Sequence, residues 1–101
     1  MKFDGRDLMI VQPEERDAAG QKILCRKDRG NVSILNSTAS EIWTYLNEPE
    51  NAEADLTSEI LAKHIETRFD VSGLTHKEIV DDVDACIGEL VSASLIEIDA
   101  M

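Results

Sequence analysis

The hydrophobic pattern of the chain changes at Thr38, from the two-residue alternation of strands to the 3.6-residue spacing of amphipathic helices. Before Thr38, apolar and β-branched runs predict strands over residues 8–11, 22–26 and 31–36. Residues 27–30, Lys-Asp-Arg-Gly, have the composition of a tight turn, so the second and third of these strands are expected to form a hairpin. The polar segment 14–20 predicts a connecting loop.

Three helices are predicted after this change of period. Thr38 and Glu41 fit a capping box at the start of the first, Thr57 is the expected N-cap of the second, and Thr75 and Glu78 fit a capping box at the start of the third. The apolar stripes of the three helices are Ala39, Ile42, Trp43 and Leu46; Ile60, Leu61, Ile65 and Phe69; and Ile79, Val80, Val83, Cys86, Ile87, Leu90, Val91 and Leu95.

Residues 95–98 alternate again and predict a short closing strand. Strands and helices are thus segregated along the chain, which argues for an α+β fold rather than a parallel α/β sheet. The expected architecture is winged-helix-like, with a three-stranded antiparallel sheet followed by three helices and a short C-terminal strand. A chain of 101 residues can bury its own core, so residues 1–101 are expected to form a single domain without disulfides or a metal.

Charge is unevenly distributed along the chain. Residues 1–38 carry a net charge of +1, whereas residues 39–101 carry −12. Nucleic-acid binding requires cations that neutralise phosphates, and anionic membranes attract basic segments, so the acidic half argues against both as partners. A groove-reading helix also needs Arg, Lys, Asn or Gln, whereas the third helix carries one Lys and five acids: Glu78, Asp81, Asp82, Asp84 and Glu89.

The expected location of the protein is the cytoplasm. The sequence has no run of 18 or more apolar residues, so no transmembrane helix is predicted. Charged residues also occupy the start of the chain, where a signal peptide would place its apolar stretch.

The residues that could carry chemistry do not converge on a site. Cys25 and Cys86 lie 61 positions apart without further ligands at zinc-site spacing, and we expect them to be buried thiols. His64 is expected at a helix margin and His76 in an exposed first turn, neither with a predicted nucleophile. The carboxylates of Asp81, Asp82 and Asp84 are predicted to form a solvated helix face rather than a metal loop. We therefore expect no catalytic residue, no metal and no cofactor.

The predicted strand at residues 32–35 lacks the Lys, Pro or bulge that usually protects a sheet edge. Two arrangements remain open: the strand is central or covered by the closing strand, or its edge is free. A free edge beside a helix could bind an extended peptide by strand addition, with backbone hydrogen bonds providing affinity.

The segment 34–43, Ile-Leu-Asn-Ser-Thr-Ala-Ser-Glu-Ile-Trp, resembles the signature of the PqqD-like family, leucine-asparagine-x-threonine-alanine-x-x-isoleucine-tryptophan. Residues 79–83, residues 86–90 and the pair 95–96 resemble the last helix and tail of that family. The resemblance covers about residues 22–98. Its first segment is fairly specific, whereas any amphipathic helix could imitate part of the second.

The resemblance implies a non-catalytic peptide chaperone, also called a RiPP recognition element, acting on ribosomally made, post-translationally modified peptides. Such a domain binds the leader segment of a precursor peptide as an added strand and presents the core segment to a modifying enzyme, often a radical S-adenosylmethionine enzyme. Carried onto this chain, the implied peptide-binding residues are Val32, Ser33, Ile34 and Leu35 on the sheet, and Asp82, Val83, Cys86 and Leu90 on the last helix.

The chain departs from the family pattern at one point. The branch that makes pyrroloquinoline quinone usually carries a proline-glutamate element after the third strand, whereas this chain has Asn36-Ser37-Thr38. This difference favours a family member that serves another peptide. The alternative functions are a winged-helix transcriptional regulator and a protein-interaction adaptor, and the chain could act as a monomer or as a homodimer paired through its open edge.

Overall fold

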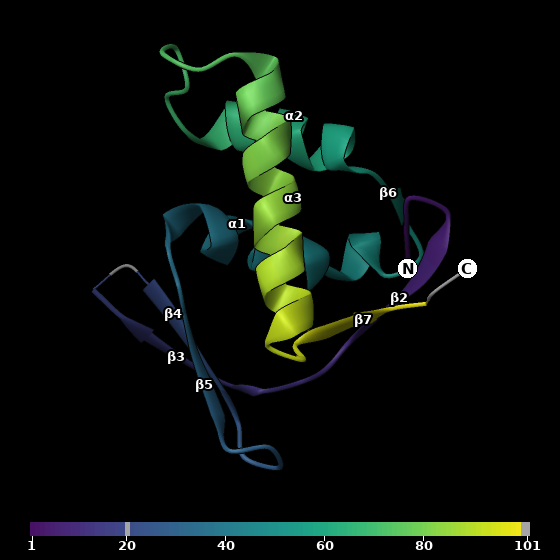
Figure 1. Ribbon diagram of the computed structural model, residues 1–101, viewed down its shortest axis with the longest axis vertical. Coiled ribbons are helices and arrows are strands. Elements are labelled where there is room, and N and C mark those ends of the chain that lie inside the picture. The colour runs from purple at the N-terminus through teal and green to yellow at the C-terminus, as the bar shows by residue number, and fades with distance from the viewer. Residues whose placement is uncertain (20, 100–101) are drawn as a thin grey trace.

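The computed structural model describes residues 1–19 and 21–99 (Figure 1). Its elements, in chain order, are β1 (Lys2–Phe3), β2 (Arg6–Ile10), β3 (Glu14–Ala18), β4 (Gln21–Arg26), β5 (Asn31–Leu35), α1 (Ser37–Leu46), a 3₁₀ turn (Pro49–Asn51), β6 (Asp55–Leu56), α2 (Ser58–Arg68), α3 (His76–Ser92) and β7 (Ile96–Ile98). The winged-helix-like α+β class and the three helices are confirmed.

The strands form two sheets. A three-stranded antiparallel sheet has the order β3-β4-β5. A four-stranded sheet of short strands has the order β6-β1-β2-β7, in which β1 pairs with β6 in parallel. The strand predicted at residues 8–11 corresponds to β2 and lies in the second sheet. The predicted three-stranded sheet exists, but a different segment supplies its first strand.

That segment is β3, and the expectation of a loop there was wrong for Glu14–Ala18. β3 is an edge strand with one solvated face, so its charged side chains can point to water while its backbone pairs with β4. The carboxylate of Glu15, an exposed residue of β3, accepts a hydrogen bond from the indole Nε1 of Trp43 in α1. Gly20, the end of the predicted loop, lies outside the described residues.

The closing strand β7 pairs with β2, with Leu8 opposite Ile98 and Ile10 opposite Ile96. It therefore completes the second sheet and does not cover β5. Of the two arrangements left open by the sequence, the free edge is the one the structure adopts.

Helix starts follow local capping chemistry, with one correction. Thr57 caps α2 and Thr75 forms a capping box with Glu78 at the start of α3, as predicted. α1 begins two residues earlier than expected, at Ser37 with Asn36 rather than Thr38 as its N-cap, because the side chain of Asn36 accepts the amide of Ala39 at 2.8 Å.

The core lies between the three helices and the inner faces of both sheets. Trp43, Ile42, Leu46, Leu61, Val83 and Leu90 are almost completely buried, together with Leu24 of β4 and Leu95 and Ile96 at the end of the chain. Four residues expected in the buried stripes are more accessible than predicted. Ile60 and Val91 are 39% and 42% exposed, and Phe69 and Val80 are half-buried. The two stripes are wide enough for their outer residues to reach solvent.

Two side chains fasten the hairpin to the helices. The Arg26 guanidinium at the end of β4 donates a 2.7 Å hydrogen bond to the carbonyl of Ser94, just after α3. Ser94 has a φ of 59°, the left-handed conformation that ends many helices. At the other end of the hairpin, the Ser40 hydroxyl lies between the carbonyl of Leu35 and the amide of Lys22.

Candidate functional site

β5 has a strand neighbour on one side only. β4 pairs with it over five positions, from Lys22 opposite Leu35 to Arg26 opposite Asn31. On its second edge, no strand pairs with β5 among residues 1–19 and 21–99. A row of backbone N–H and C=O groups therefore faces outward from residues 31–35, an arrangement suited to pairing with another chain. We call this row the β5 edge.

The side chains of β5 are uncharged and alternate between two surroundings. Leu35 is buried and Ser33 is half-buried against the helical side of the sheet, whereas Val32 and Ile34 are 67% and 65% exposed on the opposite face. The exposed pair lies opposite Cys25 and Ile23 of β4, which are only half-buried. An edge strand with two exposed apolar side chains and no charge lacks the features that usually prevent strand addition.

The two fastenings of the hairpin place β5 along α3. The first residue of β5, Asn31, is opposite Arg26, which binds the carbonyl of Ser94 at the C-terminal end of α3. The chain beyond the last residue of β5 reaches Thr38, which shares a pocket with Asp82 and Val83 in the N-terminal half of α3. The start of β5 is therefore tied to the C-terminal end of α3, and the segment after β5 lies beside the N-terminal half of α3. Figure 1 shows β5 rising toward α1 while α3 runs through the centre of the view.

The α3 residues that were predicted to bind a peptide differ in their accessibility. Asp82 is exposed and Cys86 is 8% exposed, so both lie at or close to the surface. Val83 and Leu90 are 0% and 1% exposed and belong to the core. Of these four residues, Asp82 is exposed, Cys86 is close to fully buried, and Val83 and Leu90 are core residues.

Acidic groups surround the thiol of Cys86. Burial, Glu89 and Asp82, in that order of effect, raise the pKa of Cys86 to about 11. The thiol therefore stays protonated near neutral pH, where it behaves as a small apolar group rather than as a nucleophile.

A pocket of about 170 Å³ lies at the end of β5, between the start of α1, the end of α2 and the N-terminal half of α3. We call it the α3 pocket. Most of its lining is apolar, and two carboxylates are also present. Its lining residues are Thr38, Ile65, Phe69, Asp70, Val71, Leu74, Ile79, Asp82 and Val83.

Of these residues, the sequence predicted a binding role only for Asp82 and Val83. The binding role of Phe69 was missed because periodicity placed it in the buried stripe of the second helix. Val71 and Leu74 were missed because they lie beyond the end of α2, where helical periodicity assigns no face. A signal was present: Val71 and Leu74 are apolar residues in an otherwise polar connection, and Leu74 remains 47% exposed.

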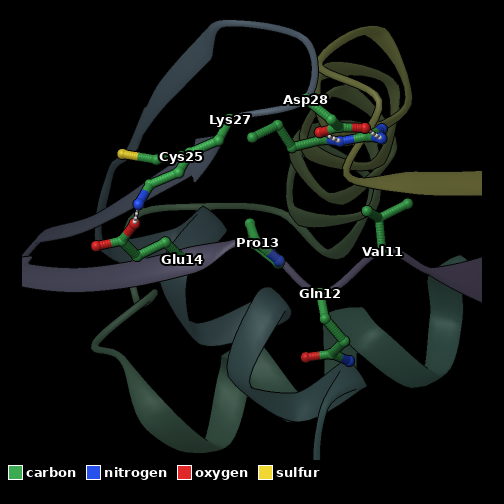
Figure 2. A pocket seen from close by; sticks show the side chains of 8 residues that line it. Val11, Gln12, Pro13, Glu14, Cys25, Lys27 and Asp28 are labelled. Atoms are coloured by element: carbon green, nitrogen blue, oxygen red, sulfur yellow. Dashed lines mark hydrogen bonds and ion pairs between the residues drawn. The ribbon is translucent and has the colours of Figure 1, made fainter.

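A second hollow, of about 330 Å³, lies where the chain crosses from β2 to β3 (Figure 2). Its charged groups are already paired, because Lys27 binds Glu14 at 3.0 Å and Arg26 binds Asp28. Figure 2 shows the Lys27 and Glu14 side chains extending toward one another across the two strands. This hollow therefore presents a neutralised polar surface, in contrast to the α3 pocket.

Both histidines are held by carboxylates. His64 Nε2 lies 2.8 Å from Glu41, its ring stacks on Tyr45 at a centroid distance of 4.2 Å, and Arg68 binds the same Glu41 oxygen at 2.9 Å. The Arg68 hydrogen bond is the main cause of the lowered pKa of Glu41. His64 and Arg68 of α2 thus contact Glu41 and Tyr45 of α1, which joins the two helices. Among residues 1–19 and 21–99, the hydrogen-bond partner of the His64 ring is a carboxylate and not a nucleophile.

A model of the family described as Coenzyme PQQ synthesis protein D matches residues 10–96 of the chain. The chain belongs to this family. The match begins at the end of β2 and ends at the start of β7, so it contains β5, α3 and the α3 pocket. The family predicted from the motif at residues 34–43 is therefore confirmed.

One solved structure similar to this PqqD-family chain is that of TbiB1 in complex with the TbiA(beta) leader peptide. The two chains are 17% identical, with a TM-score of 0.67 over 91% of this chain and 98% of the other. At this identity the likeness establishes the shared fold. No curated protein sequence matches the chain.

None of the helices in residues 1–19 and 21–99 is both long enough and apolar enough to span a membrane.

Proposed function

We propose that this protein binds the leader segment of a ribosomally made precursor peptide as an added strand on the β5 edge and presents the peptide to a modifying enzyme. The observation that carries the proposal is the uncharged β5 edge, with which no strand pairs among residues 1–19 and 21–99. The chain leads from this strand to Thr38 in the lining of the α3 pocket. Membership of the PqqD family and the fold shared with TbiB1, whose structure is a leader-peptide complex, support it.

Strand addition would use the features of β5 in two ways. The backbone of residues 31–35 would supply hydrogen bonds that do not depend on the peptide sequence. Alternate peptide side chains would extend over the face that carries Val32 and Ile34, or toward the helical side near Cys86 and Asp82. The peptide side chains over Val32 and Ile34 would cover apolar surface that is now exposed. Those on the helical side would determine which peptide sequences bind.

The proposed role is non-catalytic. Binding in the micromolar range corresponds to about −8 kcal/mol, enough to hold a leader reversibly. Tethering the peptide beside an enzyme raises its effective concentration to about the millimolar range without any new catalytic contact. Support for this role comes from His64 and His76, whose carboxylate partners fit structural tasks, and from the raised pKa of the Cys86 thiol.

An amide-shift titration tests the binding step. The proposal predicts a short precursor gene near the gene for this protein, and the probe is a synthetic peptide with the sequence of its leader segment. We expect chemical-shift changes and slower hydrogen exchange at residues 31–36. The amides of β3, the opposite edge of the same sheet, serve as the internal control and should not change. Changes confined to β3, or none along β5, would contradict the proposal.

Presentation is tested with the modifying enzyme of the same pathway. The protein should accelerate modification of a precursor in which leader and core are joined. It should give no acceleration when leader and core are supplied as separate peptides, because the tether is then lost. Equal acceleration in both cases would show that the protein acts on the enzyme rather than by presenting the peptide.

A further inference from the structure

The α3 pocket has the size of a site for one side chain. Its volume of about 170 Å³ lies below the roughly 300–1,000 Å³ of small-molecule sites. One of its lining residues, Thr38, follows the last residue of β5 by three positions. A peptide strand on the β5 edge that continued past Leu35 would therefore approach the pocket. A pocket of this kind suits an anchor residue of a bound peptide better than a cofactor.

The pocket combines an apolar wall with negative charge. Phe69, Leu74 and Ile79 contribute apolar surface, while Asp70 and Asp82 contribute carboxylates. The amide of Ser72 binds Asp70 at 3.1 Å, and this hydrogen bond lowers the pKa of Asp70, so the carboxylate is charged at neutral pH.

The nearest basic side chains on the same helices are engaged elsewhere. Arg68, at the end of α2, binds Glu41, and Lys77, in the first turn of α3, binds Asp81. Within the described chain, Asp82 itself has no ion-pair partner. The pocket therefore keeps an uncompensated negative charge beside an apolar surface, on a protein whose net charge is already −11.

We propose that the α3 pocket binds a lysine or arginine side chain of the leader peptide, with its aliphatic stem on Phe69, Leu74 and Ile79 and its cationic head beside Asp70 and Asp82. This inference rests on the proposed function, since it assigns a specificity to the same peptide. Lysine and arginine are the side chains that join a long apolar stem to a charged end, which is the combination the pocket presents. A purely apolar anchor would leave both carboxylates without a counter-charge.

The test is a double-mutant cycle between peptide and protein, read by fluorescence anisotropy of the labelled leader peptide. Each Lys or Arg of the leader is replaced in turn by norleucine, which keeps an apolar stem and removes the charge. On the protein, Asp82→Asn removes one pocket carboxylate with little change of shape. Asp81→Asn is the matched control, because it removes the same charge one residue away and outside the pocket lining.

We expect one norleucine replacement to weaken binding about fivefold or more, and this loss to fall below about twofold in Asp82→Asn but to persist in Asp81→Asn. The inference is overturned if no replacement weakens binding, if the leader binds without containing Lys or Arg, or if the two protein variants behave alike. If the leader shifts the β5 amides but shows no coupling between its Lys or Arg residues and Asp82, the basic-anchor inference fails and the proposed function stands. A leader that leaves the β5 amides unchanged would remove the proposed function as well.

Discussion

The hydroxyl of Ser40 donates a 3.2 Å hydrogen bond to the carbonyl oxygen of Leu35, which joins α1 to the last residue of β5. The same hydroxyl accepts the amide of Lys22 at 3.3 Å, so one buried side chain closes the end of the β4–β5 ladder. The position of β5 relative to the helices therefore depends on a side chain that occupies an unspecified position of the family motif and that helical periodicity does not single out.

Ser40→Ala should destabilise the protein by about 1–3 kcal/mol, because it leaves a buried carbonyl without its hydrogen bond. Urea unfolding measures the loss, and faster hydrogen exchange at the Lys22 amide should accompany it. Ser37→Ala, at an exposed position one turn earlier, is the control and should be close to neutral. Equal stability of both variants would mean that water replaces the hydroxyl.

Arg26→Met should lower stability by about 1–3 kcal/mol, since it removes a charged donor from the Ser94 carbonyl and from Asp28. The side chain of Arg26 is 10% exposed, so solvent does not substitute readily for the lost contacts. Arg29→Met, in the exposed turn of the same hairpin, should have little effect in the same unfolding experiment. If Arg29→Met were the more harmful change, the fastening of the hairpin to α3 would be unimportant.

Ser94→Gly should stabilise the protein by about 0.5–1 kcal/mol, because glycine adopts the left-handed conformation of this residue without strain. Ala85→Gly, at an exposed position inside α3, should lower stability by about 1 kcal/mol. Thermal unfolding of the two variants should therefore shift in opposite directions. Shifts of the same sign would contradict this account of the end of α3.

Part of the stability should decrease as the pH rises, through His76. Its Nδ1 lies 2.9 Å from Glu66 and its Nε2 contacts Glu59, and these carboxylates raise the pKa of His76, Glu66 most strongly. The folded state therefore favours the protonated ring. This stabilisation is fully present below the ordinary pKa of 6.5 and disappears as the pH passes the higher folded-state pKa.

The measurement is the urea midpoint between about pH 5.5 and 8.5, compared for the wild type and His76→Gln. The difference between the two proteins should be largest at the acidic end and vanish at the alkaline end. A constant difference over the whole range would show that the ring acts only through packing.

Cys86 should react with iodoacetamide much more slowly than Cys25 in the native protein near neutral pH. Its thiol is buried and has a pKa of about 11, so little thiolate forms, whereas Cys25 is only half-buried. Mass spectrometry of Cys25→Ser and Cys86→Ser variants separates the two rates, and in urea both thiols should react readily. Fast native labelling of Cys86 would mean that α3 opens at this position.

The sequence predicted correctly those helices whose apolar periodicity and N-cap residue indicate the same starting point. α2 and α3 start at the predicted Thr57 and Thr75, because a hydroxyl before an apolar stripe satisfies free amides in a way that depends on few distant contacts. The start of α1 was predicted wrongly, because the capping-box pattern of Thr38 and Glu41 pointed to Thr38 as the cap. The structure uses Asn36 and leaves Glu41 free to bind His64 and Arg68 on α2.

β3 could not be recognised from local pattern. Its residues are mostly charged, and its strand conformation depends on pairing with β4 and on the contact of Glu15 with Trp43, both of which are made only after folding. The pocket residues Phe69 and Leu74 were missed for a similar reason, because their neighbours come from three different helices. The free β5 edge was one of two predicted arrangements, and the pairing of β7 with β2 decides between them.

The two borders of the β3-β4-β5 sheet are chemically unequal. β3 presents Glu14, Glu15, Arg16 and Asp17, whereas residues 31–35 carry no ionisable group. Successive copies stacking head to tail would have to place the charged border of one molecule against the apolar border of the next, which disfavours growth into a fibre. Under the proposed function we therefore expect complexes of one protein with one peptide to dominate, even when the peptide is abundant.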